Sequence, residues 1–289
     1  MSEPLPGKLR AKWDSLIATE GKRLGLTDCR PFLENKMVND IFYEGRFNGR
    51  LCIVKCSSKA PDSIKNEYDL SLRIFRHSPS VTPEPLAYWM SDDNRAAFVV
   101  TAKIMGYSLT ELIAKGLSPN DVDRVAEDIL TLLRALENTN VVHRDLFTDN
   151  LFLDSDGHLK AIDFQFAIDR TNYRECEWMQ KNRKYQYVVF GVNHDLGLGV
   201  WNDAAALLRI TEKLPQSPKT KGVMEKLRKS FTNGIFRAPP DIMTKIKLWF
   251  YALSLVMQKF LHRKDAAKCA RFETRLNRMR SIVLRHVQK

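Results

Sequence analysis

The chain has 289 residues, of which 44% are hydrophobic, and its formal net charge at pH 7 is +12. A chain of this size and composition can bury one large core or two smaller lobes, which excludes a fibrous or disordered protein. The longest uncharged apolar run, LWFYALSLVM at 248–257, is too short for a membrane-spanning helix. The opening MSEPLPGK lacks the apolar stretch of a secretory signal, so we expect a cytoplasmic protein.

The cysteines and the charge distribution narrow the class further. The five cysteines lie at scattered spacings, which predicts reduced thiols rather than a disulfide framework. Cys52 and Cys56 are expected on the strand face opposite Lys55, and no second ligand pair follows them, so we expect no zinc site there. Residues 241–289 hold twelve Lys and Arg against three acids, so an excess of nine positive charges lies in this tail.

The first part of the chain has the pattern of a small sheet with one important helix. Its expected elements are a helix over 8–20 with Trp13, Leu16 and Ile17 on the apolar side, antiparallel strands over 31–57 broken at "EG" and "NG", a helix that opens at Pro61, and strands near 84–90 and 96–102.

The second part of the chain is mainly helical. A serine cap, a proline and apolar residues at helical spacing predict a long helix over 118–140. The sequence LFL, a turn at DSDG and HLKAIDF then predict a small hairpin, and from 196 onward helix and loop prevail. The order of elements predicts an α+β protein with a helical extension at 1–30, a sheet lobe at 31–104 and a helical lobe at 105–289 that includes the basic tail.

Five residues have the types and positions that phosphoryl transfer requires. This reaction needs the phosphates held, metal ions placed and the acceptor hydroxyl oriented. We expect Lys55 to pair with the phosphates, Glu67 to hold that lysine from the following helix, and Asp145 to accept the proton of the acceptor hydroxyl. Asn150 and Asp163 are expected to be the magnesium ligands.

These residues stand in motifs that clearly resemble the protein-kinase-like superfamily. The motifs are "IVK" at 53–55, Glu67, "HRDLFTDN" at 143–150 and "DFQ" at 163–165, in the order of that superfamily's lysine, helix glutamate, catalytic loop and metal-binding motif. The resemblance implies a two-lobed kinase fold, with ATP and Mg²⁺ as cofactors. It also implies Thr101 as gatekeeper, with Ala102, Lys103 and Ile104 at the adenine, and His143 as a residue that packs the loop rather than a base.

The chain also departs from the superfamily's pattern. No G-x-G-x-x-G precedes Lys55, and "ENKMVNDIFYEG" offers only Asn39 and Asp40 for a tight turn. The lysine that many Ser/Thr protein kinases have two residues after the catalytic aspartate is Phe147 here, and Gln165 replaces a glycine. No "APE" motif follows, and either Asp195 or Asp203 is expected to support the catalytic loop.

Divergent members with such losses include bacterial kinases of lipopolysaccharide inner-core sugars, which this chain resembles in size and basic tail. We therefore expect a lipopolysaccharide or other glycan hydroxyl as acceptor. A protein Ser/Thr kinase, a small-metabolite kinase and a pseudokinase scaffold remain as alternatives. The retention of all five site residues argues against the scaffold, which has no chemical need for them.

The basic tail suggests a partner. Its bases form a stripe if 264–289 is helical, and Phe272, Leu276, Met279 and Val283 form a second, apolar stripe. One interpretation is an anionic membrane surface, which would place the protein peripherally on the inner membrane. The other is packing on the helical lobe. Aromatic residues are few in the tail and no recognition motif accompanies it, so we expect no nucleic acid partner.

Overall fold

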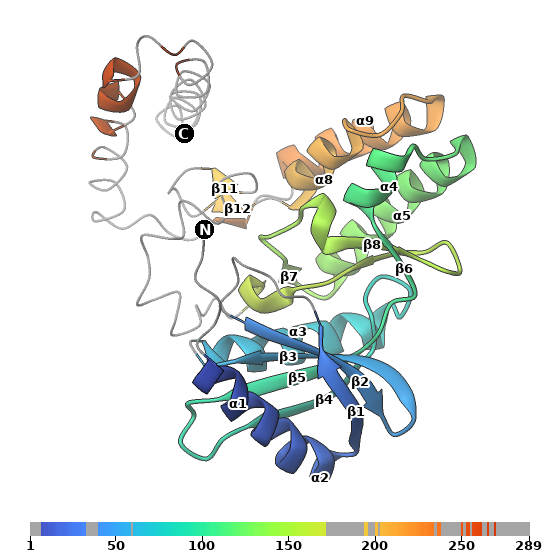
Figure 1. The fold of residues 1–289 in the computed structure, drawn as a ribbon. Coiled ribbons are helices and arrows are strands. Elements are labelled where there is room, and N and C mark those ends of the chain that lie inside the picture. The colour runs from blue at the N-terminus through green and yellow to red at the C-terminus, as the bar shows by residue number, and fades with distance from the viewer. Residues whose placement is uncertain are drawn as a thin grey trace.

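The computed structural model describes most of the two lobes and short parts of the C-terminal region. The described residues are 7–32, 40–58, 60–171, 194–195, 200–201, 203–233, 236–237, 250, 253–254, 256–261, 265 and 269. Figure 1 shows the helical lobe above the sheet lobe. The chain passes from the sheet lobe to the helical lobe between β5 (Ala97–Ala102) and β6 (Gly106–Ser108). The expected two-lobed, protein-kinase-like α+β fold is confirmed.

The N-terminal lobe is built on one antiparallel sheet in the order β1-β2-β3-β5-β4. The elements of this lobe are α1 (Gly7–Leu16), a π-helical turn η1 (Ile17–Gly21), α2 (Lys22–Leu24), β1 (Leu26–Pro31), β2 (Asp40–Phe47), β3 (Arg50–Ser57), α3 (Pro61–His77), β4 (Pro85–Met90) and β5 (Ala97–Ala102). The predicted helix that opens at Pro61 and the strands near 84–90 and 96–102 are therefore confirmed.

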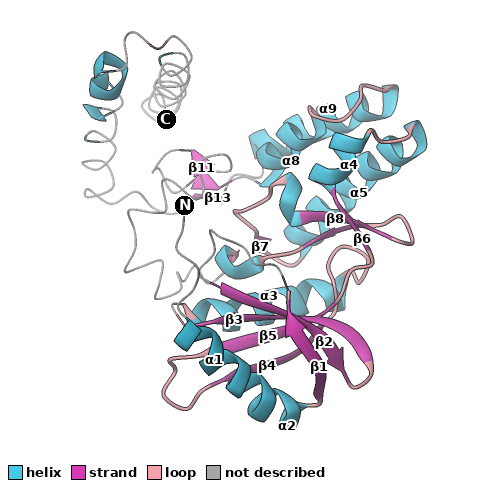
Figure 2. Cartoon of the chain, in the orientation of Figure 1, coloured by secondary structure: helices cyan, strands magenta, loops and turns pink. Residues whose placement is uncertain are grey.

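Each face of this sheet is covered by a different helix (Figure 2). Trp13 and Ile17 from the first helical stretch pack with Val54 and Phe98 in one buried cluster. Ile64 of α3 packs against the opposite face. Burial of these apolar surfaces holds the helices on the sheet at roughly 25 cal/mol per Å² of apolar area removed from water.

The boundary expected at residue 31 is wrong in its details. The helical stretch before it packs on the sheet, and Leu26–Pro31 forms strand β1, paired with β2. Residues 7–31 thus complete the N-terminal lobe instead of extending it. The reason is that the apolar side of the helix, centred on Trp13, needs a sheet to be buried, and the nearest uncovered sheet face is the one that β1 extends.

Only one of the two expected breaks in the strand region is a turn. Asn48 and Gly49 both have positive φ, 47° and 83°, and join β2 to β3 as a tight hairpin. Gly45, in contrast, lies inside β2, opposite Cys52. A Cβ at position 45 would come within 2.9 Å of the backbone oxygen of Thr27 in β1. This glycine therefore permits close strand approach and does not mark a turn.

The helical lobe is organised around the long helix α5. The serine cap is present, since the Ser118 side chain accepts a hydrogen bond from the backbone of Asp121, and buried residues such as Ile129 form its core face. The elements of this lobe are β6 (Gly106–Ser108), α4 (Leu109–Lys115), α5 (Pro119–Asn138), β7 (Val141–Val142), η2 (Thr148–Asn150), β8 (Leu151–Asp154), β9 (Leu159–Ala161), η3 (Phe164–Phe166), β10 (Ile168–Asp169), β11 (His194–Asp195), β12 (Val200–Trp201), α8 (Asp203–Thr211), α9 (Pro218–Asn233) and β13 (Phe236–Arg237).

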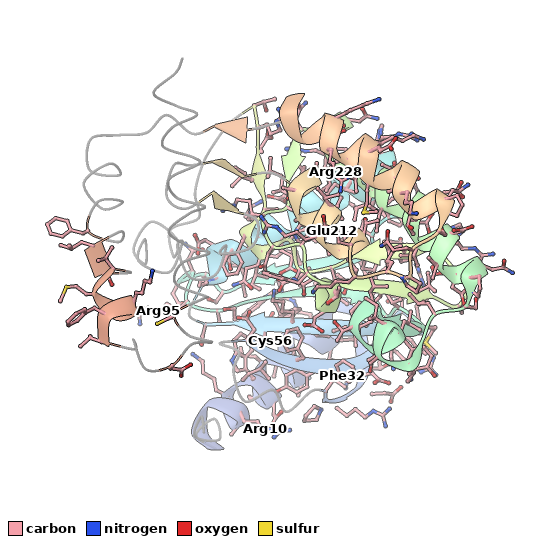
Figure 3. All side chains as sticks on the ribbon, turned by 90° about the horizontal axis from the view of Figure 1, so that it is seen from above. Arg10, Phe32, Cys56, Arg95, Glu212 and Arg228 are labelled. Carbon is pink, nitrogen blue, oxygen red and sulfur yellow. The ribbon has the colours of Figure 1, made fainter. Side chains whose placement is uncertain are left out.

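Two features of this lobe bear on the sequence-based expectations. The predicted hairpin is present as β8 and β9. The region after 193 contains short strand pairs that we did not expect, β11 with β12 and β12 with β13. Farther along, Glu212 after α8 and Arg228 of α9 form an ion pair at 3.9 Å (Figure 3).

None of the described helices combines the length and the apolar character needed to cross a membrane.

Candidate active site

The site begins with the strand alternation of β3. Cys52, Val54 and Cys56 point into the cluster under α1, and all three are fully buried. Lys55 therefore points to the other face, where α3 lies. This arrangement agrees with the expected separation of the two cysteines from the lysine. None of the four cysteines that the structure describes is in a disulfide.

Lys55 forms hydrogen-bonded ion pairs with two carboxylates from different parts of the chain. Its Nζ donates to Glu67 Oε2 of α3 at 2.8 Å and to Asp163 Oδ1 at 2.7 Å. The predicted Lys55–Glu67 pair is therefore present, and the same lysine also reaches the residue expected to bind magnesium. A buried cation held between a carboxylate of α3 and a carboxylate of the helical lobe fixes the relative position of the parts that are expected to bind the phosphates.

The charges of this cluster shift each other's pKa values. Burial opposes the charged form of Lys55, but Asp163, Glu67 and Asp40 outweigh this effect and raise its pKa. Burial and the neighbouring carboxylates of Asp163 and Asp40 raise the pKa of Glu67 despite its contact with Lys55. For Asp163, burial is outweighed by Lys55, and the pKa is lowered. Asp163 is thus a carboxylate that stays ionised, as its expected role as a metal ligand requires.

Asp40 is a site residue that the sequence analysis missed. It was read as a turn residue, but it begins β2 and pairs with Ser57 of β3. Its side chain is 3% exposed, and Oδ2 lies 3.8 Å from Lys55 Nζ. Strand alternation could have found it, because Asp40 lies diagonally opposite Lys55 on the same face of the sheet. One buried lysine therefore faces three carboxylates.

We expect Asp40→Asn to lower the dissociation constant for ATP by about tenfold, because a buried negative charge beside Lys55 opposes incoming phosphates. The measurement is calorimetric titration with ATP. Asp69→Asn serves as the control, since Asp69 lies on the same lobe with its side chain 50% exposed and paired with Lys65. Unchanged or weaker ATP binding by Asp40→Asn would contradict this assignment.

The catalytic loop follows β7, and the first residue of α8 holds it through backbone hydrogen bonds. The backbone N–H of His143 donates to Asp203 Oδ2 at 2.7 Å, and that of Arg144 donates to Asp203 Oδ1 at 3.1 Å. Asp203 is buried at the start of α8, and burial raises its pKa to about 6 although both backbone donors oppose the shift. Of the two aspartates that we proposed as supports, Asp203 makes this contact. The side chain of Asp195 lies outside the described part of the structure.

His143 packs the loop, as we expected. Its ring is fully buried and lies 4.5 Å from that of Phe164. Burial lowers its pKa to about 4, so it is neutral, with Nε2–H donating to Ile162 O at 3.0 Å. Nδ1 then accepts the backbone N–H of Asp145 at 3.3 Å. Both ring nitrogens are used in positioning, which leaves the histidine no proton-transfer role.

Asp145 stands in this loop with 8% of its surface exposed. Burial, together with repulsion from Asp163, raises its pKa to about 7. A carboxylate with a pKa near neutrality is suited to accept a proton from a hydroxyl. Asn150 donates from Nδ2 to the Asp145 backbone oxygen at 2.9 Å, so the position of Asp145 is fixed within the loop.

The residues expected to bind metal have suitable oxygen donors. The amide nitrogen of Asn150 is used within the loop, which leaves its oxygen as the metal-binding atom. Asp163 has φ 65° and ψ 63°, a left-handed conformation that turns its carboxylate toward Lys55. Oxygen ligands of this kind suit Mg²⁺. Across the described residues, no set of three or more His, Cys, Asp or Glu side chains is arranged to hold a metal by itself.

The expected gatekeeper and the three residues expected at the adenine lie where β5 leaves the sheet. Thr101 pairs with Ile53, two positions from Lys55, and therefore shares the cleft face of the sheet. The backbone of Ala102 donates to Glu84 O and that of Lys103 to Leu51 O. The Lys103 side chain turns to Glu44 at 3.0 Å and lies over the ring of Phe32. Ile104 is half-buried in the connection. Their roles toward adenine stay predictions.

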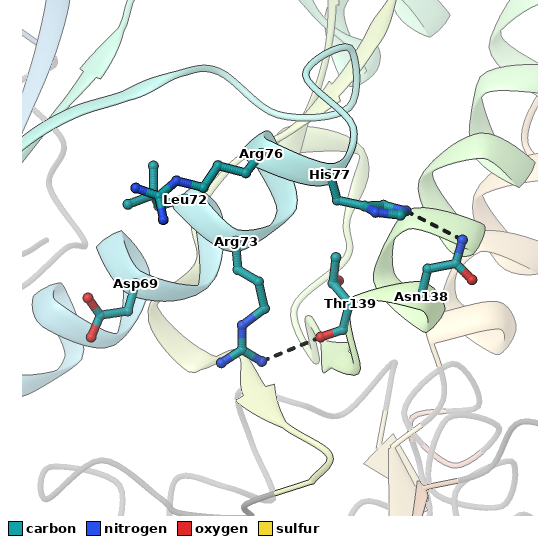
Figure 4. Close-up of a pocket in the computed structure, with 7 residues that line it drawn as sticks. All are labelled: Asp69, Leu72, Arg73, Arg76, His77, Asn138 and Thr139. Atoms are coloured by element: carbon teal, nitrogen blue, oxygen red, sulfur yellow. Dashed lines mark hydrogen bonds between the residues drawn. The ribbon is translucent and has the colours of Figure 1, made fainter.

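A pocket of about 670 Å³ lies on the side of α3 opposite Glu67 (Figure 4). Arg73, which lines it, donates to Asp169 Oδ2 of β10 at 2.6 Å and to Thr139 O at 3.4 Å. This ion pair joins α3 to the strand that follows the Asp163 loop. It thus fixes α3 on the side away from Glu67, while the Lys55–Glu67 pair fixes α3 on the side that faces Lys55.

Comparison with known proteins agrees with this geometry. Residues 54–189 match the protein kinase domain family. The chain is 26% identical over 123 residues to the serine/threonine-protein kinase AtPK1/AtPK6 of Arabidopsis thaliana, which covers 42% of this chain and 26% of the relative. It is 30% identical over 111 residues to cAMP-dependent protein kinase catalytic subunit 3 of Drosophila melanogaster, which covers 38% of this chain and 18% of the relative.

A third relative, extracellular signal-regulated kinase 7 of Drosophila melanogaster, is 24% identical over 199 residues, 61% of this chain and 22% of the relative. The chain therefore spans about a quarter or less of the length of these relatives. These relatives are all named as kinases. Together with the two-lobed fold, the matches show that residues 54–189 are similar to a protein kinase domain.

Proposed function

We propose that this protein is an ATP- and magnesium-dependent kinase that transfers the γ-phosphate of ATP to a hydroxyl group. The observation that carries the proposal is the double contact of Lys55 with Glu67 and Asp163, in the same cleft as the ordered loop of Asp145. The protein-kinase domain match at 54–189 begins beside this lysine and includes Glu67, Asp145, Asn150 and Asp163, whereas Asp40 and Asp203 lie outside it.

The chemistry divides among the residues as follows. Lys55, held by Glu67, binds the phosphates, and Asp145 orients the acceptor hydroxyl and accepts its proton. Asn150 and Asp163 hold the metal ion, which neutralises charge on the phosphates when it is bound. Asp203 and His143 keep the catalytic loop in place through its backbone. Because catalysis of this reaction is mostly positioning, the fixed loop is as important as the groups it carries.

We propose a glycan hydroxyl, on lipopolysaccharide or a similar glycolipid, as the acceptor. Phe147, half-buried two residues after Asp145, supports a sugar acceptor because an aromatic ring can pack on a sugar face while it offers no charge to a peptide substrate. A protein serine or threonine is the second candidate, since the relatives described above are named as protein kinases. We also propose that the protein is cytoplasmic and peripheral on the membrane that contains the glycolipid.

The test is incubation with labelled ATP and Mg²⁺, separately with lipopolysaccharide and with total cell protein, followed by protease digestion. We expect label in lipopolysaccharide that survives the protease, and none with Asp145→Ala. Label in protein instead would establish the second acceptor. ATP binding without label in any acceptor and without phosphate release would overturn the kinase assignment in favour of a nucleotide-binding scaffold.

A further inference from the structure

Large apolar side chains are exposed on the helical residues around 250–261. Phe250 is 59% exposed, Met257 58%, Phe260 67% and Leu261 73%, and Leu253 and Val256 are also exposed. Figure 1 shows this orange-red segment apart from the two lobes, and Figure 3 shows the segment with its side chains as sticks. In the described part of the chain, no other element exposes so many large apolar groups. Exposed apolar groups gathered on one element mark an interaction surface.

These side chains share one side of the helix. Phe250, Leu253, Met257 and Phe260 follow each other at steps of three and four residues, which places them in a single stripe. Val256 and Leu261 lie at the two edges of that stripe, whereas Lys259 lies well outside it. We call the six apolar residues the apolar face. The apolar face therefore carries no charge, and Lys259 is the only charged residue of 250–261.

The surrounding sequence is strongly basic. Lys245 and Lys247 precede the apolar face, Arg263 and Lys264 follow it directly, and residues 241–289 as a whole carry nine more bases than acids. A partner of this region must therefore be negatively charged. A second copy of the chain would bring an equally basic region against the first, and this repulsion disfavours a dimer through the apolar face.

We infer that the apolar face of residues 250–261 inserts into an anionic lipid surface. The flanking bases attract the lipid headgroups, each by about 1 kcal/mol, and the apolar face enters the boundary between headgroups and acyl chains. The apolar run at 248–257 is long enough for this shallow insertion and too short to span the bilayer. The inference goes beyond the proposed reaction, because it concerns a surface outside the ATP site and does not depend on the acceptor.

The inference also differs from attachment by charge alone, which was the expectation for the tail bases that lie outside the described residues. Charge attraction is screened over about 3 Å at 1 M salt, whereas apolar insertion is not. We therefore expect a part of the binding to survive high salt. That part should depend on the apolar face, and the salt-sensitive part should depend on the bases.

The experiment is co-sedimentation of the full chain with phosphatidylcholine vesicles that contain phosphatidylglycerol, at low and high salt and without ATP. The variant Phe250→Ser, Met257→Ser, Phe260→Ser should lose about tenfold in binding for each side chain removed. Met105→Ser is the matched control, since Met105 is 53% exposed in the connection between β5 and β6. Circular dichroism shows whether each variant is folded.

A gain-of-binding variant protects the test against a folding defect. Phe260→Trp should bind the vesicles more tightly than the wild type, because tryptophan favours the membrane interface. The inference is overturned if the triple variant binds like the wild type, if the wild type does not bind, or if vesicles of phosphatidylcholine alone bind equally well. Loss of vesicle binding with phosphate transfer to a soluble acceptor intact would separate this inference from the proposed kinase activity.

Discussion

Replacing Asp145 with alanine is expected to lower kcat for phosphate transfer by about 10²- to 10⁴-fold while ATP affinity stays nearly unchanged. The reason is that Asp145 accepts the proton of the acceptor hydroxyl and does not contact the phosphates, which Lys55 holds. Calorimetric titration with ATP and single-turnover transfer measure the two effects separately. Asp149→Ala is the matched control, because Asp149 lies in the same loop with an exposed side chain.

The burial of Asp145 adds a pH dependence to this prediction. Its pKa is raised to about 7, so the base is lost by protonation below that value, and kcat/KM should fall as pH decreases from 7. The contribution of Asp145 to the free energy of unfolding changes with pH in the opposite direction. A raised carboxyl pKa favours the folded state at low pH, and this contribution is lost as pH rises through about 7. Asp145→Asn should therefore melt at a higher temperature than the wild type at pH 8, with the difference shrinking toward pH 5.

Equal activity of wild type and Asp145→Ala would refute the role of Asp145 as base.

Asp163→Asn is expected to remove the magnesium-dependent part of ATP binding, whereas Lys55→Ala should weaken ATP binding with or without magnesium. One residue is proposed to hold the ion and the other the phosphates. Lys55→Ala should also reduce the free energy of unfolding by about 3–5 kcal/mol, because it leaves the buried carboxylates of Glu67 and Asp40, and the partly exposed carboxylate of Asp163, without their cation. Asp163→Asn removes one of the three negative charges and should not show this loss.

Titration with ATP in the presence and absence of Mg²⁺, and thermal unfolding without ligand, measure these effects. Asp156→Asn is the control, since Asp156 is exposed in the turn between β8 and β9. The assignment of the two roles is falsified if both variants show wild-type thermal shifts with ATP and magnesium.

The local periodicity of the sequence was enough to predict much of the sheet lobe and part of the site. Alternation along β3 predicted that Lys55 faces away from the two cysteines, and the helix that opens at Pro61 placed Glu67 within reach of the lysine. Both relations depend on residues close in sequence, whose directions follow from strand and helix geometry. The wrong turn at Gly45 has a similarly local cause, because a glycine that allows close strand approach looks the same in sequence as one that makes a turn.

The parts that were missed depend on pairing between distant segments. Asp40 belongs to the Lys55 cluster only through the register of β2 on β3. The choice between Asp195 and Asp203 depended on how α8 docks under the catalytic loop. The exposed apolar face at 250–261 could not be recognised from the run of apolar letters, since a buried helix has the same composition and only the fold tells which side chains stay exposed.

The double contact of Lys55 has a consequence for how nucleotide and metal enter the site. When phosphates take Lys55, Asp163 loses its cation, and when a metal ion takes Asp163, Lys55 loses one of its carboxylates. If the phosphates enter alone, their negative charge lies beside an Asp163 that has lost its cation, and if the metal enters alone, its positive charge lies beside a Lys55 that keeps Glu67 as its hydrogen-bond partner. Entry of the metal and the phosphates as one complex replaces both partners together and conserves the local charge balance. The closed ion cluster should therefore discriminate against metal-free nucleotide, and the two ligands should bind with positive cooperativity.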